Sequence, residues 1–254
     1  MILAVDVGNS NIVFGIHDSG QWLKVWRIQT DPRKTADEYE VIFRSLLISS
    51  RVCKSKVEQV VFSSVVPSLN REFGTMIPRL LETELIIVSP DIYDRLPLKV
   101  LNPYEIGTDL VANAVAAYTR FGEMCMVIDF GTALTFTTIA DDGTILGVAI
   151  APGMQTAVKA LAGNTAQLPH VQLILPPSVL GTNTVHAIQS GVVIGFGGLV
   201  DRIIEKTGQE LQREIITIAT GGLAGVFAAR SEKIRFIEDN LTLEGLRIIG
   251  SLVR

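Results

Sequence analysis

The stretch ILAVDVGNSN at residues 2–11 has a counterpart in MVIDFGTALT at residues 126–135. In both, an apolar run ends at an aspartate, Asp6 or Asp129, and a glycine follows two positions later. A second glycine, in the turns DSG and DDG, lies 14 residues after each aspartate. Short β-branched and apolar segments flank these turns, as is typical of β-hairpins. Each stretch therefore predicts the start of three strands joined by tight turns.

The agreement between the two stretches has two readings. Asp-x-Gly tripeptides are common in turns, so chance could repeat one of them. The matched second glycine and the apolar run before each aspartate favour internal duplication instead. After each copy, helical patterns alternate with apolar runs of strand type, which predicts a largely parallel sheet covered on its faces. We expect helices within residues 35–52, 68–82, 153–168, 184–211 and 242–254, and strands within residues 57–67, 84–90 and 213–222.

The segment between the two copies, residues 96–122, starts with a proline- and asparagine-containing connection and continues as an alanine-rich helix. A chain of 254 residues accommodates one large α/β unit or two lobes of about 120 residues. We place the lobe boundary in the connection, which gives an N-terminal lobe at 1–105 and a C-terminal lobe at 106–254. The predicted fold class is α/β, with two similar lobes that each hold a mixed, largely parallel sheet.

The composition predicts a folded protein without a general affinity for nucleic acid. Apolar residues make up 48% of the chain and charged residues 19%, unlike disordered chains. The net charge of −4 and the pI near 5.5 provide no basic footprint for a phosphate backbone. We therefore expect no nucleic-acid partner.

The few cysteines and histidines favour neither disulfides nor a structural metal. Cys53 and Cys125 lack zinc-type spacing, and His17, His170 and His186 are scattered. No stretch reaches the roughly 18 uninterrupted apolar residues of a membrane helix, and no basic leader precedes the first expected strand. We expect a cytoplasmic protein with no membrane partner.

The two aspartate turns have the chemistry of a phosphate site. Ligands of open α/β sheets bind beyond the carboxyl ends of strands, so we expect Asp6 and Asp129 to face one nucleotide cleft between the lobes. The small residues after them expose backbone N–H groups that suit phosphate oxygens. The carboxylates would hold a cation that screens the phosphates. Together these features predict a nucleoside triphosphate clamp.

A third carboxylate, Asp109, lies at the start of the alanine-rich helix. It has two readings. One is a helix N-cap, worth about 1 kcal/mol. The other is a general base that accepts the proton of a substrate hydroxyl as its oxygen attacks the γ-phosphate.

The ordered motifs DVGNSN, NPYEIGTD, IDFGTALT, GVAIAPG, GTNT, QSG and TGG resemble those of the type III pantothenate kinases, over residues 1–246. That family is a branch of the actin, sugar-kinase and heat-shock ATPase superfamily. The resemblance implies lobes of duplicated ribonuclease H-like, actin-like ATPase topology. It also implies ATP-dependent phosphorylation of pantothenate to 4'-phosphopantothenate, the first step of coenzyme A biosynthesis. The cofactors would be ATP, Mg²⁺ and a monovalent cation, K⁺ or NH₄⁺, and the enzyme would be a homodimer.

The resemblance also assigns residues one by one. It implies a general base at Asp109 and a cation site at Asp129 and Asp6. The implied ATP contacts are Asp6, Val7, Gly8, Asn9, Ser10, Asn11, Ile12, Val13, Thr132, Gly221 and Gly222, and the implied substrate contacts are Gly107, Thr108, Asp109, Leu110 and Thr184.

Two positions depart from the family pattern. Leu110 stands where members usually have an arginine, which can bind the pantothenate carboxylate through two parallel hydrogen bonds. Val100 stands where many have a tyrosine. Lys99 or Arg120 would be substitutes for the missing cation, or else ordinary surface charges. The departures leave open a non-catalytic nucleotide-binding regulator and a kinase for another small hydroxylated substrate.

Two further features have a structural and a functional reading. His186 would be either a helix-surface residue or a substrate contact. The GFGG segment at residues 195–198 lacks the spacing of a dinucleotide fingerprint, and we expect it to allow close helix packing or to lie at a dimer interface.

Overall fold

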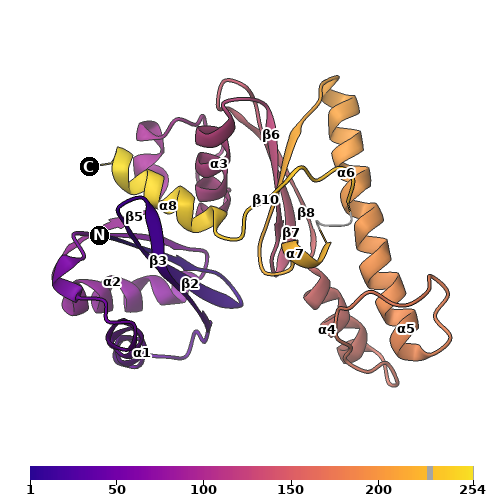
Figure 1. Ribbon diagram of the computed structural model, residues 1–254, viewed down its shortest axis with the longest axis horizontal. Helices are drawn as coiled ribbons and strands as arrows, with labels where there is room; N and C mark the ends of the chain where they lie inside the picture. Colours follow the sequence, from indigo (N-terminus) through magenta and orange to yellow (C-terminus); the bar gives the residue numbers. More distant parts are fainter. Residues whose placement is uncertain (228–230, 254) are drawn as a thin grey trace. The chain divides into compact units, whose positions relative to one another are not determined.

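The computed structural model describes residues 1–227 and 231–253 (Figure 1). The chain forms two compact units. Unit 1 comprises Met1–Arg120 together with the C-terminal segment that starts at Leu241, and unit 2 comprises Phe121–Asn240. Compared with the predicted lobes at 1–105 and 106–254, unit 1 also includes the alanine-rich helix and the last helix of the chain.

Unit 1 is built on a five-stranded mixed sheet in the order β3-β2-β1-β4-β5. The first three strands form an antiparallel meander, while β4 and β5 run parallel to β1. The aspartate of the first turn, Asp6, pairs in register with Ser63 of β4. The strands are β1 (Ile2–Val7), β2 (Asn11–Asp18), β3 (Gln21–Gln29), β4 (Gln59–Ser64) and β5 (Glu84–Ile87).

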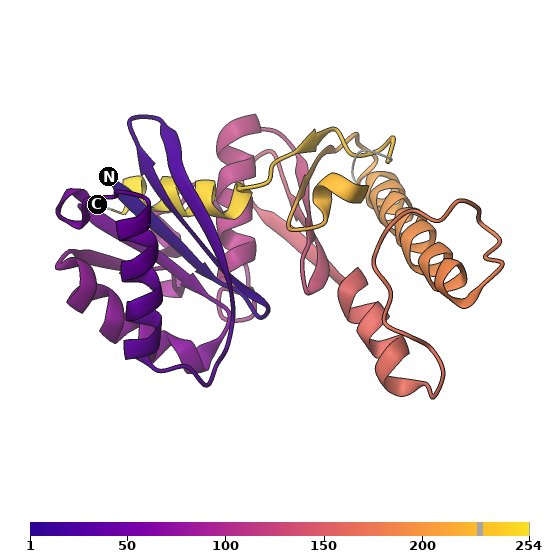
Figure 2. The same ribbon diagram turned by 60° about the horizontal axis from the view of Figure 1, so that its bottom comes forward.

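Helices pack on both faces of this sheet (Figures 1 and 2). Leu3, Val5 and Val7 of β1 belong to a core with the buried aromatic residues of α1 and α2, as the alternation of side chains along a strand requires. On the other face α8 contacts β1, β2 and β4. The helical segments are α1 (Ala36–Ser49), η1 (Lys54–Lys56), α2 (Pro67–Leu81), η2 (Pro90–Arg95), α3 (Thr108–Phe121) and α8 (Leu241–Leu252).

Local sequence accounts for several boundaries in unit 1. Thr35 caps α1 and forms a capping box with Glu38, which confirms the expected helix start. Pro67 occupies the first turn of α2, where its missing N–H has no helical partner to lose. The expected strand at 57–67 is therefore shortened to β4. A second proline, Pro78, lies inside α2.

Unit 2 repeats the topology of unit 1. Its sheet has the order β10-β9-β6-β7-β8, with an antiparallel meander of β6, β7 and β8 and with β9 and β10 parallel to β6. Asp129 pairs with Thr220 of β9, as Asp6 pairs with Ser63. The predicted α/β class with two similar lobes is confirmed. The strands are β6 (Cys125–Phe130), β7 (Ala133–Ile139), β8 (Ile145–Pro152), β9 (Ile216–Thr220) and β10 (Phe236–Ile237).

The helices of unit 2 share one core with alternate residues of β6. The single helix expected at 184–211 is divided by a π-helical turn. This segment, Thr184–Leu211, is the one helix of the described residues whose length and composition would allow a membrane span, and Val200 and Ile204 within it pack in the core. The helical segments are α4 (Met154–Asn164), α5 (Thr184–Gln189), η3 (Ser190–Ile194), α6 (Gly195–Leu211) and α7 (Ala224–Phe227).

Candidate active site

The first aspartate turn is a tight loop held by the end of β3. The Gly8 N–H donates to the Asn11 carbonyl at 3.0 Å. Thr30 donates twice, from its N–H to the Ser10 carbonyl at 3.1 Å and from Oγ1 to the Gly8 carbonyl at 2.7 Å. These bonds occupy loop carbonyls, while Asn9 and Ser10 at the tip are exposed. The loop thus has a fixed backbone and an accessible tip, as an anion site requires.

Not every residue of the predicted phosphate loop presents its side chain. Val7 and Ile12 are fully buried in the unit 1 core. Val13 and Asn11 are half-buried on β2. A ligand at this loop would therefore meet Val7 and Ile12 only through their backbone.

The second aspartate turn is held in the same way. The Gly131 N–H donates to the Ala133 carbonyl at 3.1 Å. The Thr132 carbonyl accepts two bonds from the start of α4, at 2.9 Å from the Gly153 N–H and at 2.7 Å from Thr156 Oγ1. In both units the segment after the third strand thus fixes the turn after the first strand.

The Asp129 carboxyl lies against a glycine turn that follows β9. Gly221 has φ +95°, in the region that favours glycine. A Cβ at Gly221 would lie 2.5 Å from Asp129 Oδ1 and 2.8 Å from the Phe130 nitrogen. A Cβ at Gly131 would lie 3.5 Å from the same Oδ1. The structure therefore brings Asp129, Gly131 and Gly221 together, with Gly222 exposed beside them.

Hydrogen bonds between the start of α3 and the end of β4 hold Asp109 near the first aspartate turn. Thr108, the first residue of α3, shares a hydrogen bond of 2.9 Å between its Oγ1 and Ser63 Oγ. The same Oγ1 lies 3.3 Å from the Ser64 carbonyl, to which it donates. Because β4 is the parallel neighbour of β1, the first turn of α3 lies at the sheet edge where the Asp6 turn begins.

The electrostatics of Asp109 suit an acid–base group. Burial raises the pKa of its carboxyl, and hydrogen bonds from backbone N–H groups oppose this shift. One of them, from the Leu110 N–H to Oδ1, measures 2.8 Å. Gly107 leaves room for Oδ1, because a Cβ there would overlap it. The carboxyl thus binds an otherwise free helix N–H, as a capping group does, and has a perturbed pKa, as a base does.

No guanidinium lies beside Asp109 at position 110, and Arg120 lies far along the same helix. The side chain of Leu110 is 8% exposed and belongs to the interior. Arg120 lies in the last turn of α3, eleven residues from Asp109, which is about 16 Å along a helix. Val100 is half-buried and Lys99 is exposed in the connection before α3.

Thr184 is exposed at the first position of α5 in unit 2. The turn before it folds onto the helix, since a Cβ at Gly181 would collide with the Ala187 backbone. Asn183 caps α5 by accepting the His186 N–H at 2.9 Å, and its amide lies 3.1 Å from His186 Nδ1. His186 therefore has a partner within the cap of its own helix.

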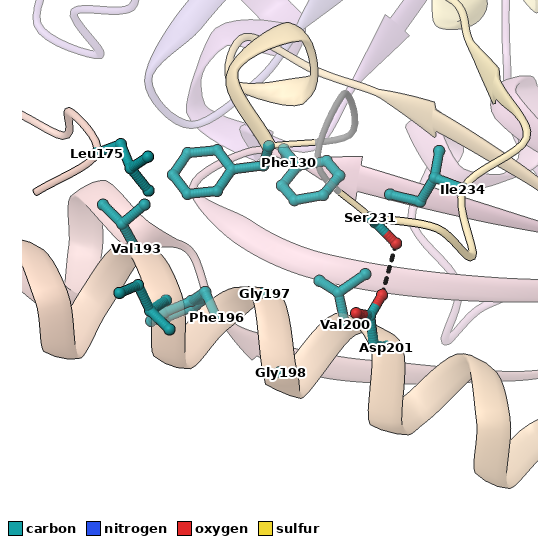
Figure 3. Close-up of a pocket in the computed structure, with 12 residues that line it drawn as sticks. Phe130, Leu175, Val193, Phe196, Gly197, Gly198, Val200, Asp201, Ser231 and Ile234 are labelled. Carbon is teal, nitrogen blue, oxygen red and sulfur yellow. Dashed lines mark hydrogen bonds between the residues drawn. The ribbon is translucent and has the colours of Figure 1, made fainter. Parts of the chain in front are cut away.

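Unit 2 also contains an apolar pocket of about 270 Å³ (Figure 3). Phe130, the residue after Asp129, lines it together with Gly197 and Gly198 of α6. Ser231 Oγ donates to Asp201 Oδ1 at 2.5 Å at its border. A Cβ at Gly195, Gly197 or Gly198 would meet no atom within 4 Å, so these glycines do not pack closely against another part of the described chain, and the dimer interface stays a prediction.

Several residues that build these sites carry a weak sequence signal. Ser63 and Ser64 end an apolar run, which places polar groups at the carboxyl end of a parallel strand and could have indicated a role. Thr30 and Thr156 follow third strands, and only the three-dimensional structure shows which carbonyls they bind.

The fold and these paired turns define the class of protein. The chain has the fold of an inorganic polyphosphate/ATP-glucomannokinase from Arthrobacter sp. strain KM, with a TM-score of 0.52 and 15% identity over 100% of this chain and 99% of that one. It also has the fold of MreB 5 of Spiroplasma citri bound to AMPPNP, with a TM-score of 0.56 and 11% identity over 98% and 96%. It is an α/β protein of the actin-like ATPase and sugar-kinase fold.

Sequence comparison identifies the family within this fold. The family model described as type III pantothenate kinase matches residues 2–206. The type III pantothenate kinase of Myxococcus xanthus (strain DK1622) is 41% identical over 249 residues, 98% of this chain and 97% of the relative. That of Moorella thermoacetica (strain ATCC 39073 / JCM 9320) is 42% identical over 250 residues, 98% of each. The chain belongs to the type III pantothenate kinase family.

Proposed function

We propose that this protein transfers the γ-phosphoryl group of ATP to the hydroxyl of pantothenate, forming 4'-phosphopantothenate in the first step of coenzyme A biosynthesis. The observation that carries the proposal is the 41–42% identity to type III pantothenate kinases over 98% of the chain. Both aspartate turns and Asp109 lie within residues 2–206, which the family model matches, and the two turns follow the corresponding strands β1 and β6.

The two fixed turns would bind the ATP phosphates through backbone N–H groups. Phosphoryl transfer requires positioning and charge stabilisation more than covalent participation by the protein. The rigid loop carbonyls bonded by Thr30 and by Thr156 support that role, because the N–H groups of a fixed loop keep their direction. Gly221 and Gly222 would allow close approach of the adenosine part.

Asp6 and Asp129 would hold a cation. Carboxylate oxygens are preferred ligands of hard cations, and Asp129 Oδ1 lies against glycine backbone that leaves space around it. Within residues 1–227 and 231–253 no three acidic, histidine or cysteine groups gather as a metal cluster. A Mg²⁺ or a monovalent cation, K⁺ or NH₄⁺, would thus complete its shell with phosphate oxygens and water, and would screen the phosphate charge.

Asp109 would accept the proton of the substrate hydroxyl. Its raised pKa makes it a stronger base than an ordinary aspartate once it is ionised. Gly107, Thr108 and Leu110 would shape the substrate site around it, and Thr184 would be a further substrate contact. We also propose a cytoplasmic homodimer that takes a small-molecule substrate and has neither nucleic-acid nor membrane partners.

A coupled ADP-release assay with the purified protein, ATP, Mg²⁺ and K⁺ tests the proposal. Pantothenate should stimulate ADP release, and Asp109→Asn should abolish that stimulation. Asp239→Asn, which changes an exposed aspartate outside the predicted site, serves as the control and should be active. Undiminished turnover in Asp109→Asn would remove this residue from its proposed role.

Leu110 and Val100 favour a second candidate, a kinase or nucleotide sensor that does not recognise the pantothenate carboxylate. Leu110 has no charge to bind a carboxylate, and it is buried. A panel of small hydroxylated acceptors in the same assay, with calorimetric titration of ATP and pantothenate, separates the two. Binding of ATP without pantothenate binding, and ADP release with a different acceptor, would support the second candidate.

A further inference from the structure

A tyrosine outside all the roles assigned above lies buried in unit 1. Tyr93 belongs to η2, and the residue is 5% exposed. Its hydroxyl oxygen is shielded from solvent and has no hydrogen-bond partner among the described residues. A buried hydroxyl without a partner is costly, because it has lost its bonds to water. Such a group in a folded protein calls for an explanation, and a catalytic role is one of the recognised ones.

The charge that acts on this hydroxyl is that of Asp109. Burial and, as the smaller cause, the negative charge of Asp109 together raise the pKa of Tyr93 to about 12. No other charged group of the described residues contributes to the shift. The segments that carry the two residues both meet the end of β4. The Val88 N–H, two residues before η2, donates to the Phe62 carbonyl at 2.9 Å, and the adjacent Ser63 shares its 2.9 Å hydrogen bond with Thr108, the neighbour of Asp109. Tyr93 therefore lies within electrostatic reach of the proposed base. It keeps its proton at neutral pH and is available as a donor.

Asp109 in turn has capacity for a donor. An ionised carboxylate accepts up to about four hydrogen bonds, and the donors to this carboxyl are the backbone N–H groups of Leu110 and of Asp109 itself. Burial disfavours its ionised form, which is the form that a general base needs. A hydrogen bond to the charged form would counteract that burial.

We propose that Tyr93 is a positioning residue for Asp109, whose carboxylate accepts a hydrogen bond from the Tyr93 hydroxyl in the substrate-bound enzyme. The bond keeps the carboxylate ionised and fixes its direction. In the reaction the acceptor oxygen forms a bond to the γ-phosphorus, the bond from that phosphorus to the β–γ bridging oxygen breaks, and the hydroxyl proton moves to Asp109. Tyr93 keeps its own proton throughout. This inference rests on the proposed function, because Asp109 has an acid–base role only there.

The pH dependence of kcat in Tyr93→Phe tests the proposal. The substitution removes only the hydroxyl, so the acidic limb of the kcat profile should move up by about one pH unit, as expected for one hydrogen bond to a charged group. On that limb kcat should fall about tenfold, with little change in KM. An acidic limb at the wild-type position would overturn the proposal.

Tyr39→Phe is the matched control. Tyr39 is an equally buried tyrosine of unit 1, but its hydroxyl already donates to the Asp31 carbonyl at 3.0 Å. Its loss should lower stability without moving the acidic limb. A limb that moves equally in both variants would show a general effect of losing a buried hydroxyl and would overturn the specific role.

A measurement independent of turnover separates this inference from the proposed function. In protein labelled with ¹³Cζ-tyrosine, the Tyr93 resonance, assigned by its loss in Tyr93→Phe, should follow the ionisation of Asp109, whose burial raises its pKa above the ordinary value. Asp109→Asn should remove that titration. If the wild type phosphorylates no acceptor, the proposed function fails, and the NMR titration still decides whether the two residues interact. Turnover of pantothenate without the titration would overturn the Tyr93 proposal alone.

Discussion

A graded series of glycine substitutions tests the glycine turn beside Asp129. Gly221→Ala places a Cβ 2.5 Å from Asp129 Oδ1 and 2.8 Å from the Phe130 nitrogen, at a φ of +95°. The left-handed backbone costs about 1–2 kcal/mol for a residue with a side chain. The forced displacement of neighbours adds about 1–3 kcal/mol. We expect a total loss of roughly 2–5 kcal/mol in the free energy of unfolding, from these two contributions.

Two other glycines separate these contributions. Gly20 has a φ of +87°, and a Cβ there would meet no atom within 4 Å, so Gly20→Ala isolates the backbone cost of about 1–2 kcal/mol. Gly225 lies in α7 with open space and no positive φ, and Gly225→Ala should be neutral or stabilising by up to about 1 kcal/mol.

Urea unfolding and calorimetric titration with ATP provide the two readouts. Because the chain has two compact units, midpoints are compared by separate spectroscopic probes rather than through one fitted transition. Displacement of the Asp129 carboxyl in Gly221→Ala should also weaken ATP binding about tenfold or more, equivalent to about 1.4 kcal/mol. The reasoning fails if Gly221→Ala destabilises no more than Gly20→Ala and binds ATP normally.

Three further predictions concern unit 1. Thr30→Val removes the 2.7 Å hydrogen bond to the Gly8 carbonyl, so the free energy of unfolding should fall by about 1 kcal/mol. Calorimetric titration should show weaker ATP binding. Unchanged ATP affinity would contradict a role of this bond in fixing the loop. Because burial raises the folded-state pKa of Asp109, the folded state binds more protons, and this group's contribution to stability falls as pH rises from its unfolded pKa of about 3.8 through the folded value. Asp109→Asn should therefore stabilise the protein in thermal melts at pH 7, with the gain disappearing below about pH 4, and a constant gain at all pH values would refute this assignment. Leu110→Arg should not create a carboxylate site, because it places a charge in the interior. We expect the free energy of unfolding, measured with urea, to fall by more than about 2 kcal/mol. A fully stable variant that binds pantothenate more tightly would contradict this prediction.

The duplication was predictable because its signals are local. The apolar runs before Asp6 and Asp129, the glycines after them and the Asp-Gly turns depend on neighbouring residues, and the structure confirms both meanders. The α1 start at Thr35 follows from a capping pattern of four residues. Features of this kind need no knowledge of the tertiary fold.

Other features depend on contacts between distant segments. The return of α8 to unit 1 and the bond between Ser63 and Thr108 join residues that no local pattern relates. Burial of Tyr93 is another such case, since a tyrosine in a polar connection reads as a surface residue. The sequence does not show whether the GFGG segment packs closely or faces open space, because an absent side chain is compatible with both and only neighbouring atoms decide.

The position of α8 has a consequence for how the chain is made. Gln59 Nε2 donates to the Gly250 carbonyl at 3.1 Å, and Thr242 Oγ1 donates to Asn113 Oδ1 at 2.8 Å. A Cβ at Gly245 would collide with the Ala112 backbone, so α3 and α8 pack closely. The ribosome synthesises α8 only after all of unit 2. The first 120 residues therefore emerge as a nascent domain that lacks one of its helices, and unit 2 has the opportunity to fold before unit 1 is complete.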